Sequence, residues 1–207
     1  MLSNKLSCDL SNNQRHLFFA GFCLLILVFI AYWPSFFVPF YLDDRVSIVE
    51  NSLLTQGSII DLFHHHGLRF IAYLSFWLNE QWFAGSLLSY HSVNFTIHCL
   101  NAVLIYLVVR KFIDCTQSTP SDRAQYIVPL CIAGIWLLHP LNIQAVTYIV
   151  QRTAALVTTF ALITILSYLQ CVTDGINKKR VFFCDSRYMR IFDKAKLHCR
   201  LVVFSAI

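Results

Sequence analysis

Two adjacent carboxylates, Asp43 and Asp44, follow the first long apolar run of the chain almost directly. A carboxylate in this position can accept a proton from an attacking hydroxyl group or hold a divalent cation. Neighbouring residues of an extended segment point to opposite sides, so the two carboxylates are expected to differ in role. The alternative interpretation is a solvated Asp-Asp turn after a helix.

A stripe of polar side chains runs along the second apolar run. His91, Asn94, His98 and Asn101 follow one another at intervals of three or four residues, which places them on one face of a helix. Polar groups in hydrocarbon are costly unless they are paired. This face is therefore expected to meet other helices or a wet cavity, and both interhelical hydrogen bonding and substrate binding remain open.

Other polar residues are candidates for substrate contact or for metal binding. Arg69 and Arg152 could bind a phosphate group through bidentate hydrogen bonds, although Arg152 could instead snorkel at the membrane surface. His139 closes the third apolar run and joins the same substrate-binding set. The consecutive histidines 64–66 are expected in a solvated loop, because three neighbours cannot all converge on one ion. No close cysteine pair has zinc-ligand spacing, so no protein metal site is predicted.

A membrane protein must position these residues. Apolar residues make up 57% of the 207 and charged residues 13%, against roughly 45–50% and 25% in soluble domains. The predicted fold class is therefore an all-α integral membrane protein of about four transmembrane helices. A long outer loop at 34–92 is expected to carry juxtamembrane helices, including one at 70–84 with its apolar side toward the bilayer. The predicted spans are 17–33, 93–109, 126–141 and 154–172.

Charge decides the topology, because the third run is short and could be either a crossing or a re-entrant hairpin. With four crossings and an inner amino terminus, 13 of the 16 Lys and Arg residues lie inside, as the positive-inside rule favours. Both termini are then cytoplasmic, and residues 173–207 form a basic cytoplasmic tail. A cleaved signal peptide is disfavoured by the bulky residues after the first run. Basic residues sorted by membrane side also argue against a nucleic-acid partner.

Several short motifs occur in a particular order between residues 40 and 169. They are Leu42-Asp43-Asp44-Arg45, Glu50-Asn51-Ser52-Leu53-Leu54, Leu74-Ser75-Phe76-Trp77-Leu78-Asn79, Tyr90-His91-Ser92-Val93-Asn94 and the segment from His139-Pro140 to Gln151-Arg152. This order resembles the membrane region of GT-C glycosyltransferases. It is most similar to tetratricopeptide-repeat membrane proteins related to protein O-mannosyltransferases, with an ending at Arg152 like that of bacterial members. A bacterial inner membrane is therefore the expected location.

The resemblance implies an enzyme that transfers a sugar, with inversion, from a polyprenyl-phosphate carrier in the membrane to an acceptor hydroxyl at the outer face. Asp43 or Asp44 takes the catalytic position, and the acceptor is expected to be a protein. Beyond a divalent cation, no cofactor is implied. The substrate-binding residues are then Arg69, Arg152, His91, Asn94, His98 and His139.

The family has many more spans, so the chain is expected to be a truncated amino-terminal part, with a partial GT-C fold over residues 1–172. A non-catalytic four-span scaffold or binding protein is the alternative.

Overall fold

The computed structural model describes residues 19–116 and 124–173, and every regular element within them is helical. This agrees with the predicted all-α class. The predicted cytoplasmic tail falls outside the described residues, apart from Thr173.

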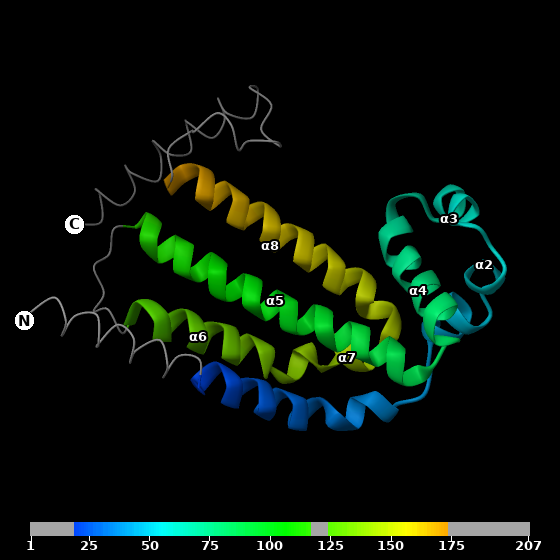
Figure 1. The fold of residues 1–207 in the computed structure, drawn as a ribbon, viewed down its shortest axis with the longest axis horizontal. Helices are drawn as coiled ribbons and strands as arrows, with labels where there is room; N and C mark the ends of the chain where they lie inside the picture. Colours follow the sequence, from blue (N-terminus) through cyan, green and yellow to red (C-terminus); the bar gives the residue numbers. More distant parts are fainter. Residues whose placement is uncertain (1–18, 117–123, 174–207) are drawn as a thin grey trace, which may run out of the picture.

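Four long helical segments run side by side, with α5 (Leu87–Cys115) in the middle (Figure 1). The first segment covers residues 19–32 and continues as the 3-10 helix η1 (Trp33–Phe37). Two further helices, α6 (Ala124–Leu137) and α8 (Arg152–Thr173), pack against α5. Three segments are long and apolar enough to cross a membrane, namely Phe19–Phe37, Leu87–Cys115 and Ile149–Val172. They match three predicted spans: the first ends later than predicted, the second is longer at both ends, and the last begins earlier.

The third predicted span is broken rather than straight. Between α6 and the next elements, η4 (Pro140–Ile143) and α7 (Gln144–Thr147), the helix axis bends by 61°. His139 has extended backbone angles and precedes Pro140, whose ring disfavours a helical residue before it. The short length of the predicted run thus has a local cause, which is the His-Pro break.

The broken segment advances along α5 in one direction. His98 contacts the Leu137 carbonyl below the bend, and His91 contacts the Val146 carbonyl above it. These histidines are seven residues apart, or about 10 Å along a helix. The chain therefore continues after the bend toward the end of α5 where the acidic motif lies.

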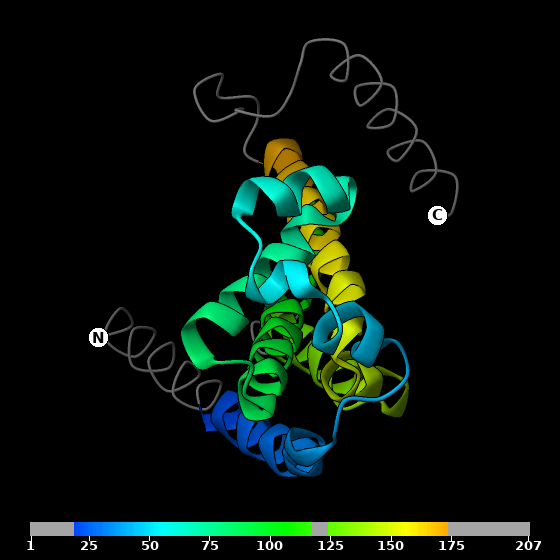
Figure 2. The ribbon, with the colours of Figure 1, turned by 90° about the vertical axis from the view of Figure 1, so that its right-hand side faces the viewer.

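Five short helices form the segment between the first two long ones and gather at one end of the bundle (Figure 2). They are η2 (Arg45–Val49), α2 (Ser52–Thr55), α3 (Ile59–His66), η3 (Gly67–Arg69) and α4 (Phe70–Phe83). Ser58 and Asp61 form a capping box at the start of α3. The histidines at 64–66 occupy the last turn of α3, so the prediction of a loop was wrong there.

Helix α4 occupies the predicted segment, with one polar residue turned toward the bundle. Asn79 is only 3% exposed, whereas Ile71, Trp82 and Phe83 are exposed. Asn79 hydrogen-bonds with Ser89 of α5 and with Arg152 of α8. The contact of the apolar side of α4 with the bilayer stays a prediction.

The turn after α4 uses two left-handed residues, Ala84 (φ 48°) and Gly85 (φ 65°). Glycine is favoured at the second position, because its φ of 65° is strained for residues with a Cβ atom; a Cβ there would also push against the movable Glu80 carboxylate, 2.5 Å away. Ser86 then caps α5 by accepting a hydrogen bond from the backbone of Ser89. The turn brings α4 and α5 together at the polar end of the bundle.

Candidate active site

Asp44 is a buried carboxylate that joins two distant parts of the chain. One of its oxygens, Oδ1, accepts a hydrogen bond of 2.8 Å from the backbone N–H of Val150, in the 3-10 turn η5 (Ile149–Gln151). Oδ2 has no hydrogen-bond partner among the described residues. Burial raises the pKa of Asp44, and nearby backbone N–H groups and His91 offset this only in part. Asp44 is therefore built into the fold rather than presented to a ligand.

Asp43 differs from its neighbour because its side chain is exposed. Tyr148 lies beside the motif, and the charges of both carboxylates act on its hydroxyl group. The Tyr148 ring stacks on Tyr41 with 5.0 Å between ring centroids. Asp43 thus stands next to a pair of aromatic rings, accessible to a hydroxyl group that approaches from solvent.

The backbone just before the two carboxylates is left-handed. Leu42 has φ of 50° and is 73% exposed, an unfavourable conformation for a residue with a Cβ atom. Asp43 and Asp44 follow in a helical turn, not in the extended segment that the prediction assumed. They nevertheless diverge as expected, since one side chain is exposed and the other is buried.

Arg152 is a fully buried cation surrounded by neutral oxygen atoms. Its Nε donates to Asn94 Oδ1 at 2.6 Å, and Nη1 donates to Asn79 Oδ1 at 2.7 Å. Nη1 also reaches Ser75, while Nη2 donates to the Tyr90 carbonyl at 2.9 Å. The guanidinium carbon lies 4.5 Å from the centre of the Phe76 ring. All three nitrogens are occupied by the protein, so this guanidinium ties α4, α5 and α8 together.

The polar stripe on α5 is buried throughout, as predicted. His91, Asn94, His98 and Asn101 are each at most 1% exposed. Asn94 donates to the carbonyls of Tyr148 and Ile149, and Asn101 donates to that of Ala155. The two asparagines therefore meet α8 and the turn before it, and the two histidines meet other parts of the chain rather than acyl chains.

His91 is the residue of the stripe that affects the pKa of Asp44. Its Nδ1 lies 3.0 Å from the Val146 carbonyl and its Nε2 lies 2.9 Å from that of Val38. Carbonyl oxygens only accept, so a ring nitrogen that bonds to either of them does so as a donor. A charge on His91 lowers the pKa of the Asp44 carboxyl group.

Arg69 and His139 lie apart from this buried network. Arg69 ends η3 with an exposed side chain, as a cation that contacts a soluble or lipid phosphate would need. His139 sits at the bend, where its Nδ1 accepts from the backbone N–H of Leu141. Among the described residues, no group of three or more His, Cys, Asp or Glu side chains is placed to hold a metal ion.

Sequence reasoning missed several residues that shape the site. Ser75, Asn79 and the Tyr90 carbonyl hold Arg152, and Tyr148 and Tyr41 flank the carboxylates. Asn79 carried one signal, since a polar residue in an apolar helix needs a partner. Nothing local to Arg152 indicated which distant residues would surround it.

The chain is similar to proteins named protein O-mannosyl-transferase. It is 29% identical over 159 residues to TMTC3 of Mus musculus and 28% identical over 151 residues to TMTC3 of Homo sapiens. It is 27% identical over 158 residues to Tmtc1 of Drosophila melanogaster. These matches cover 70%, 66% and 69% of this chain, but 16%, 15% and 17% of the relatives. The chain therefore spans about one sixth of the length of the curated relatives it matches.

No family model matches the chain, and no solved structure does so either. The names of the distant relatives are consistent with a glycosyltransferase relationship, which the order of motifs predicted. The several long apolar helices indicate a membrane protein.

Proposed function

We propose that this chain carries the acidic end of a membrane glycosyltransferase site of the GT-C type. The site would transfer a sugar, with inversion, from a polyprenyl-phosphate carrier to an acceptor hydroxyl, which we take to be on a protein. Mannose is the sugar to test first, because the relatives are named O-mannosyl-transferases. The observation that carries the proposal is the exposed Asp43 beside the buried Asp44.

Asp43 acts as the general base in this proposal. Its exposed carboxylate can accept the proton of the acceptor hydroxyl while that oxygen attacks the sugar carbon and the carrier phosphate leaves. Asp44 acts as a positioning residue, because its hydrogen bond to Val150 holds the motif against the turn before α8. A divalent cation on the carboxylates stays a hypothesis.

The phosphate contact falls to Arg69 rather than to Arg152. Arg69 is exposed, whereas the guanidinium nitrogens of Arg152 already bond to Asn94, Asn79 and Tyr90. Arg152, together with His91, Asn94 and His98, would then support the site from within the bundle. His139 would contribute to the shape of the bend.

The proposed topology has four crossings, with the broken α6–η4–α7 segment as the third. Its steady advance along α5 supports a crossing over a re-entrant hairpin. The end with the acidic motif is then outside and both termini are inside. A bacterial inner membrane and a relationship to tetratricopeptide-repeat proteins remain predictions from the motif order.

A non-catalytic four-span protein is the second candidate. The buried, fully bonded Arg152 and the stripe on α5 favour it, because they form a stable polar core that needs no substrate. In that case neither carboxylate should affect sugar transfer.

The deciding experiment measures mannose transfer from a polyprenyl-phosphate donor in membranes that contain the chain. Asp43→Asn should lower turnover by roughly 10²–10⁴-fold, because the base is lost while the shape is kept. Asp44→Asn keeps an acceptor for Val150 and should retain most activity, whereas Asp44→Ala should not. Unchanged rates in Asp43→Asn, Asp44→Asn and the double variant, or no transfer by the unmodified chain, would favour the non-catalytic candidate.

A further inference from the structure

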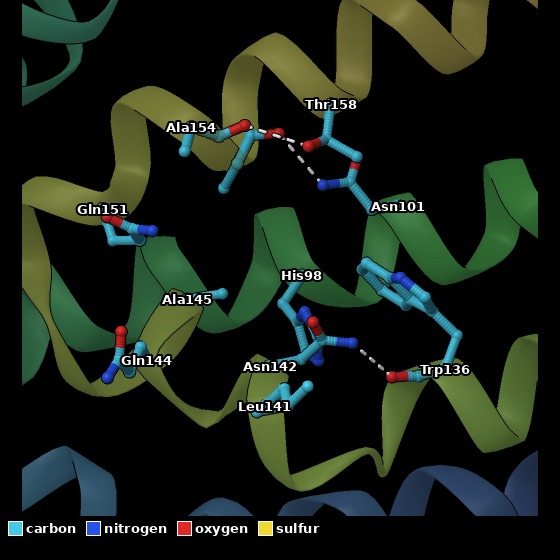
Figure 3. A pocket seen from close by; sticks show the side chains of 11 residues that line it. His98, Asn101, Trp136, Leu141, Asn142, Gln144, Ala145, Gln151, Ala154 and Thr158 are labelled. Atoms are coloured by element: carbon cyan, nitrogen blue, oxygen red, sulfur yellow. Dashed lines mark hydrogen bonds between the residues drawn. The ribbon is translucent and has the colours of Figure 1, made fainter.

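A cavity of about 160 Å³ lies between α5, the bend after α6 and the beginning of α8 (Figure 3). Its polar lining includes His98, Asn142, Gln144, Gln151 and Thr158, and Trp136 supplies an aromatic wall. None of the lining residues is a carboxylate, a lysine or an arginine. The cavity has room for several water molecules, so it could hold a small head group but not an acyl chain.

His98 brings a buried nitrogen without a partner to this cavity. Its Nε2 lies 3.1 Å from the Leu137 carbonyl, which can only accept a hydrogen bond, so Nε2 carries the proton. The Tyr32 hydroxyl donates to the same carbonyl at 3.1 Å, and its oxygen, 3.2 Å from Nε2, can accept a share of the Nε2 proton. The other nitrogen, Nδ1, is then a bare acceptor. It is buried and has no hydrogen-bond partner among the described residues.

The remaining polar groups of the lining are neutral, and some of their hydrogen-bonding capacity is unused. The Asn142 amide nitrogen donates to the Trp136 carbonyl at 2.7 Å, which leaves the side-chain oxygen to accept (Figure 3). The Thr158 hydroxyl donates to the Ala154 carbonyl at 3.0 Å, and its oxygen can still accept a hydrogen bond. Gln151 and Gln144 add amide donors and acceptors. The Trp136 ring stands 4.8 Å from the His98 ring.

This chemistry selects against charged ligands. The lining has no cation to hold a phosphate and no carboxylate to hold an amine. A bare histidine nitrogen needs a donor, and the amide groups can take part as donors or acceptors. The aromatic ring offers a flat apolar surface beside them. A hydroxyl-bearing, uncharged group satisfies all of these conditions together.

We propose that this cavity binds an uncharged, hydroxyl-bearing head group, with one hydroxyl donating to Nδ1 of His98. The site is separate from the carboxylate of the proposed function, although the two share the η5 turn. Asp44 holds that turn at Val150, and Gln151, the next residue, faces the cavity. The hydroxyl group can belong to a membrane lipid or to a free sugar.

The test uses the full chain labelled with 5-fluorotryptophan in phosphatidylcholine nanodiscs. Trp136→Phe identifies the ¹⁹F resonance that reports on the cavity wall. The lipid probe is monoglucosyl diacylglycerol, and the free probe is methyl glucoside in the buffer. The matched controls are tetra-acetylated monoglucosyl diacylglycerol, which has lost every hydroxyl donor, and phosphatidic acid, which is charged.

We expect a saturable shift of the Trp136 resonance with at least one hydroxyl probe and none with either control. If only the lipid probe shifts the resonance, the head group belongs to a lipid. If only the free probe does so, the ligand is a soluble sugar. Gln151→Met and Thr158→Val should each weaken binding about tenfold, roughly the effect of one lost hydrogen bond. Thr164→Val is the matched variant, because Thr164 also bonds to the carbonyl four residues earlier in α8 but does not line the cavity.

Three results would overturn the proposal. The first is the absence of a saturable shift with either hydroxyl probe, which would leave a cavity that holds only water. The second is equal binding of the acetylated lipid, and the third is equal loss of binding in Thr164→Val and Thr158→Val. These variants change neither Asp43 nor Asp44, so failure here would leave the proposed sugar transfer untouched.

Discussion

The Asp44 carboxylate accepts a 2.8 Å hydrogen bond from Val150, a residue 106 positions later in the chain. This contact fixes the segment after the first helix against the turn that begins the last one. It also separates the two neighbouring carboxylates, because Asp44 is held inside while Asp43 remains exposed. A pair of identical side chains thereby acquires two different environments.

The buried state of Asp44 predicts a pH dependence of stability. Burial raises its pKa in the folded chain above the ordinary value of 3.8, so the folded state binds the proton more tightly than the unfolded state. The contribution of Asp44 to stability should be fully present below pH 3.8 and decrease as pH rises through the raised pKa. Thermal unfolding of the wild type and of Asp44→Asn, measured in nanodiscs from pH 3.5 to 7, checks this. Unfolding temperatures that differ by a constant amount across this range would contradict it.

Asp61 should show the opposite dependence. Its hydrogen bonds with Ser58 lower its pKa, so the stabilisation is present above the ordinary pKa and lost as pH falls through the lowered one. Relative to Asp61→Asn, the wild type should therefore lose stability on acidification. The same unfolding measurements, extended to pH values well below 3.5, test it, with Ser58→Ala as a variant that should reduce the dependence because only the backbone hydrogen bond remains. A wild type that gains stability over Asp61→Asn at acidic pH would show the sign to be wrong.

A variant of Arg152 should lose stability, whereas a variant of Arg69 should lose donor binding and keep its stability. Arg152→Met leaves the oxygens of Asn94, Asn79 and Tyr90 without their donors, at about 1–3 kcal/mol for each buried group. Arg69→Met changes an exposed side chain and should stay within about 0.5 kcal/mol of the wild type. Denaturant titration in micelles measures both.

Variants of Arg69 also test the affinity for the sugar donor. Arg69→Met should weaken binding of the polyprenyl-phosphate sugar, and Arg69→Lys should restore part of it by keeping the charge. If Arg69→Met bound the donor as tightly as the wild type, Arg69 would have no place in the proposed site.

Topology is testable with single cysteines. In a background without reactive thiols, Ser58→Cys lies among the short helices at the acidic end, and Ser186→Cys lies in the predicted basic tail. An impermeant maleimide added from outside should label position 58 and leave position 186 unreacted until the membrane is opened. The reverse pattern would rule out four crossings with an inner amino terminus.

The sequence predicted the parts of the fold that follow from solvation. A polar stripe on an apolar helix must find partners, and His91 and Asn94 do so. The His139-Pro140 pair likewise indicated where the third run ends, since the residue before proline leaves the helix. Both inferences depend on local chemistry, which a sequence carries directly.

The parts that escaped prediction depend on long-range contacts or on local backbone choice. Asn79 and Arg152 meet across 73 residues, and this contact fixes which side of α4 packs against the bundle. The left-handed Leu42 placed the carboxylates in a helical turn, although a leucine gives no signal for that conformation. Whether Arg152 would snorkel or be buried depended on partners that only the assembled fold supplies.

The buried Arg152 also constrains the order in which the chain can be made. Its partner Asn94 is synthesised 58 residues earlier, which is roughly 3–12 s at 5–20 residues per second. During that interval the Asn94 amide oxygen lacks the guanidinium, and an unpaired polar group in hydrocarbon is costly. Insertion of α5 together with α8 avoids that cost, so the two helices are expected to enter hydrocarbon as a pair.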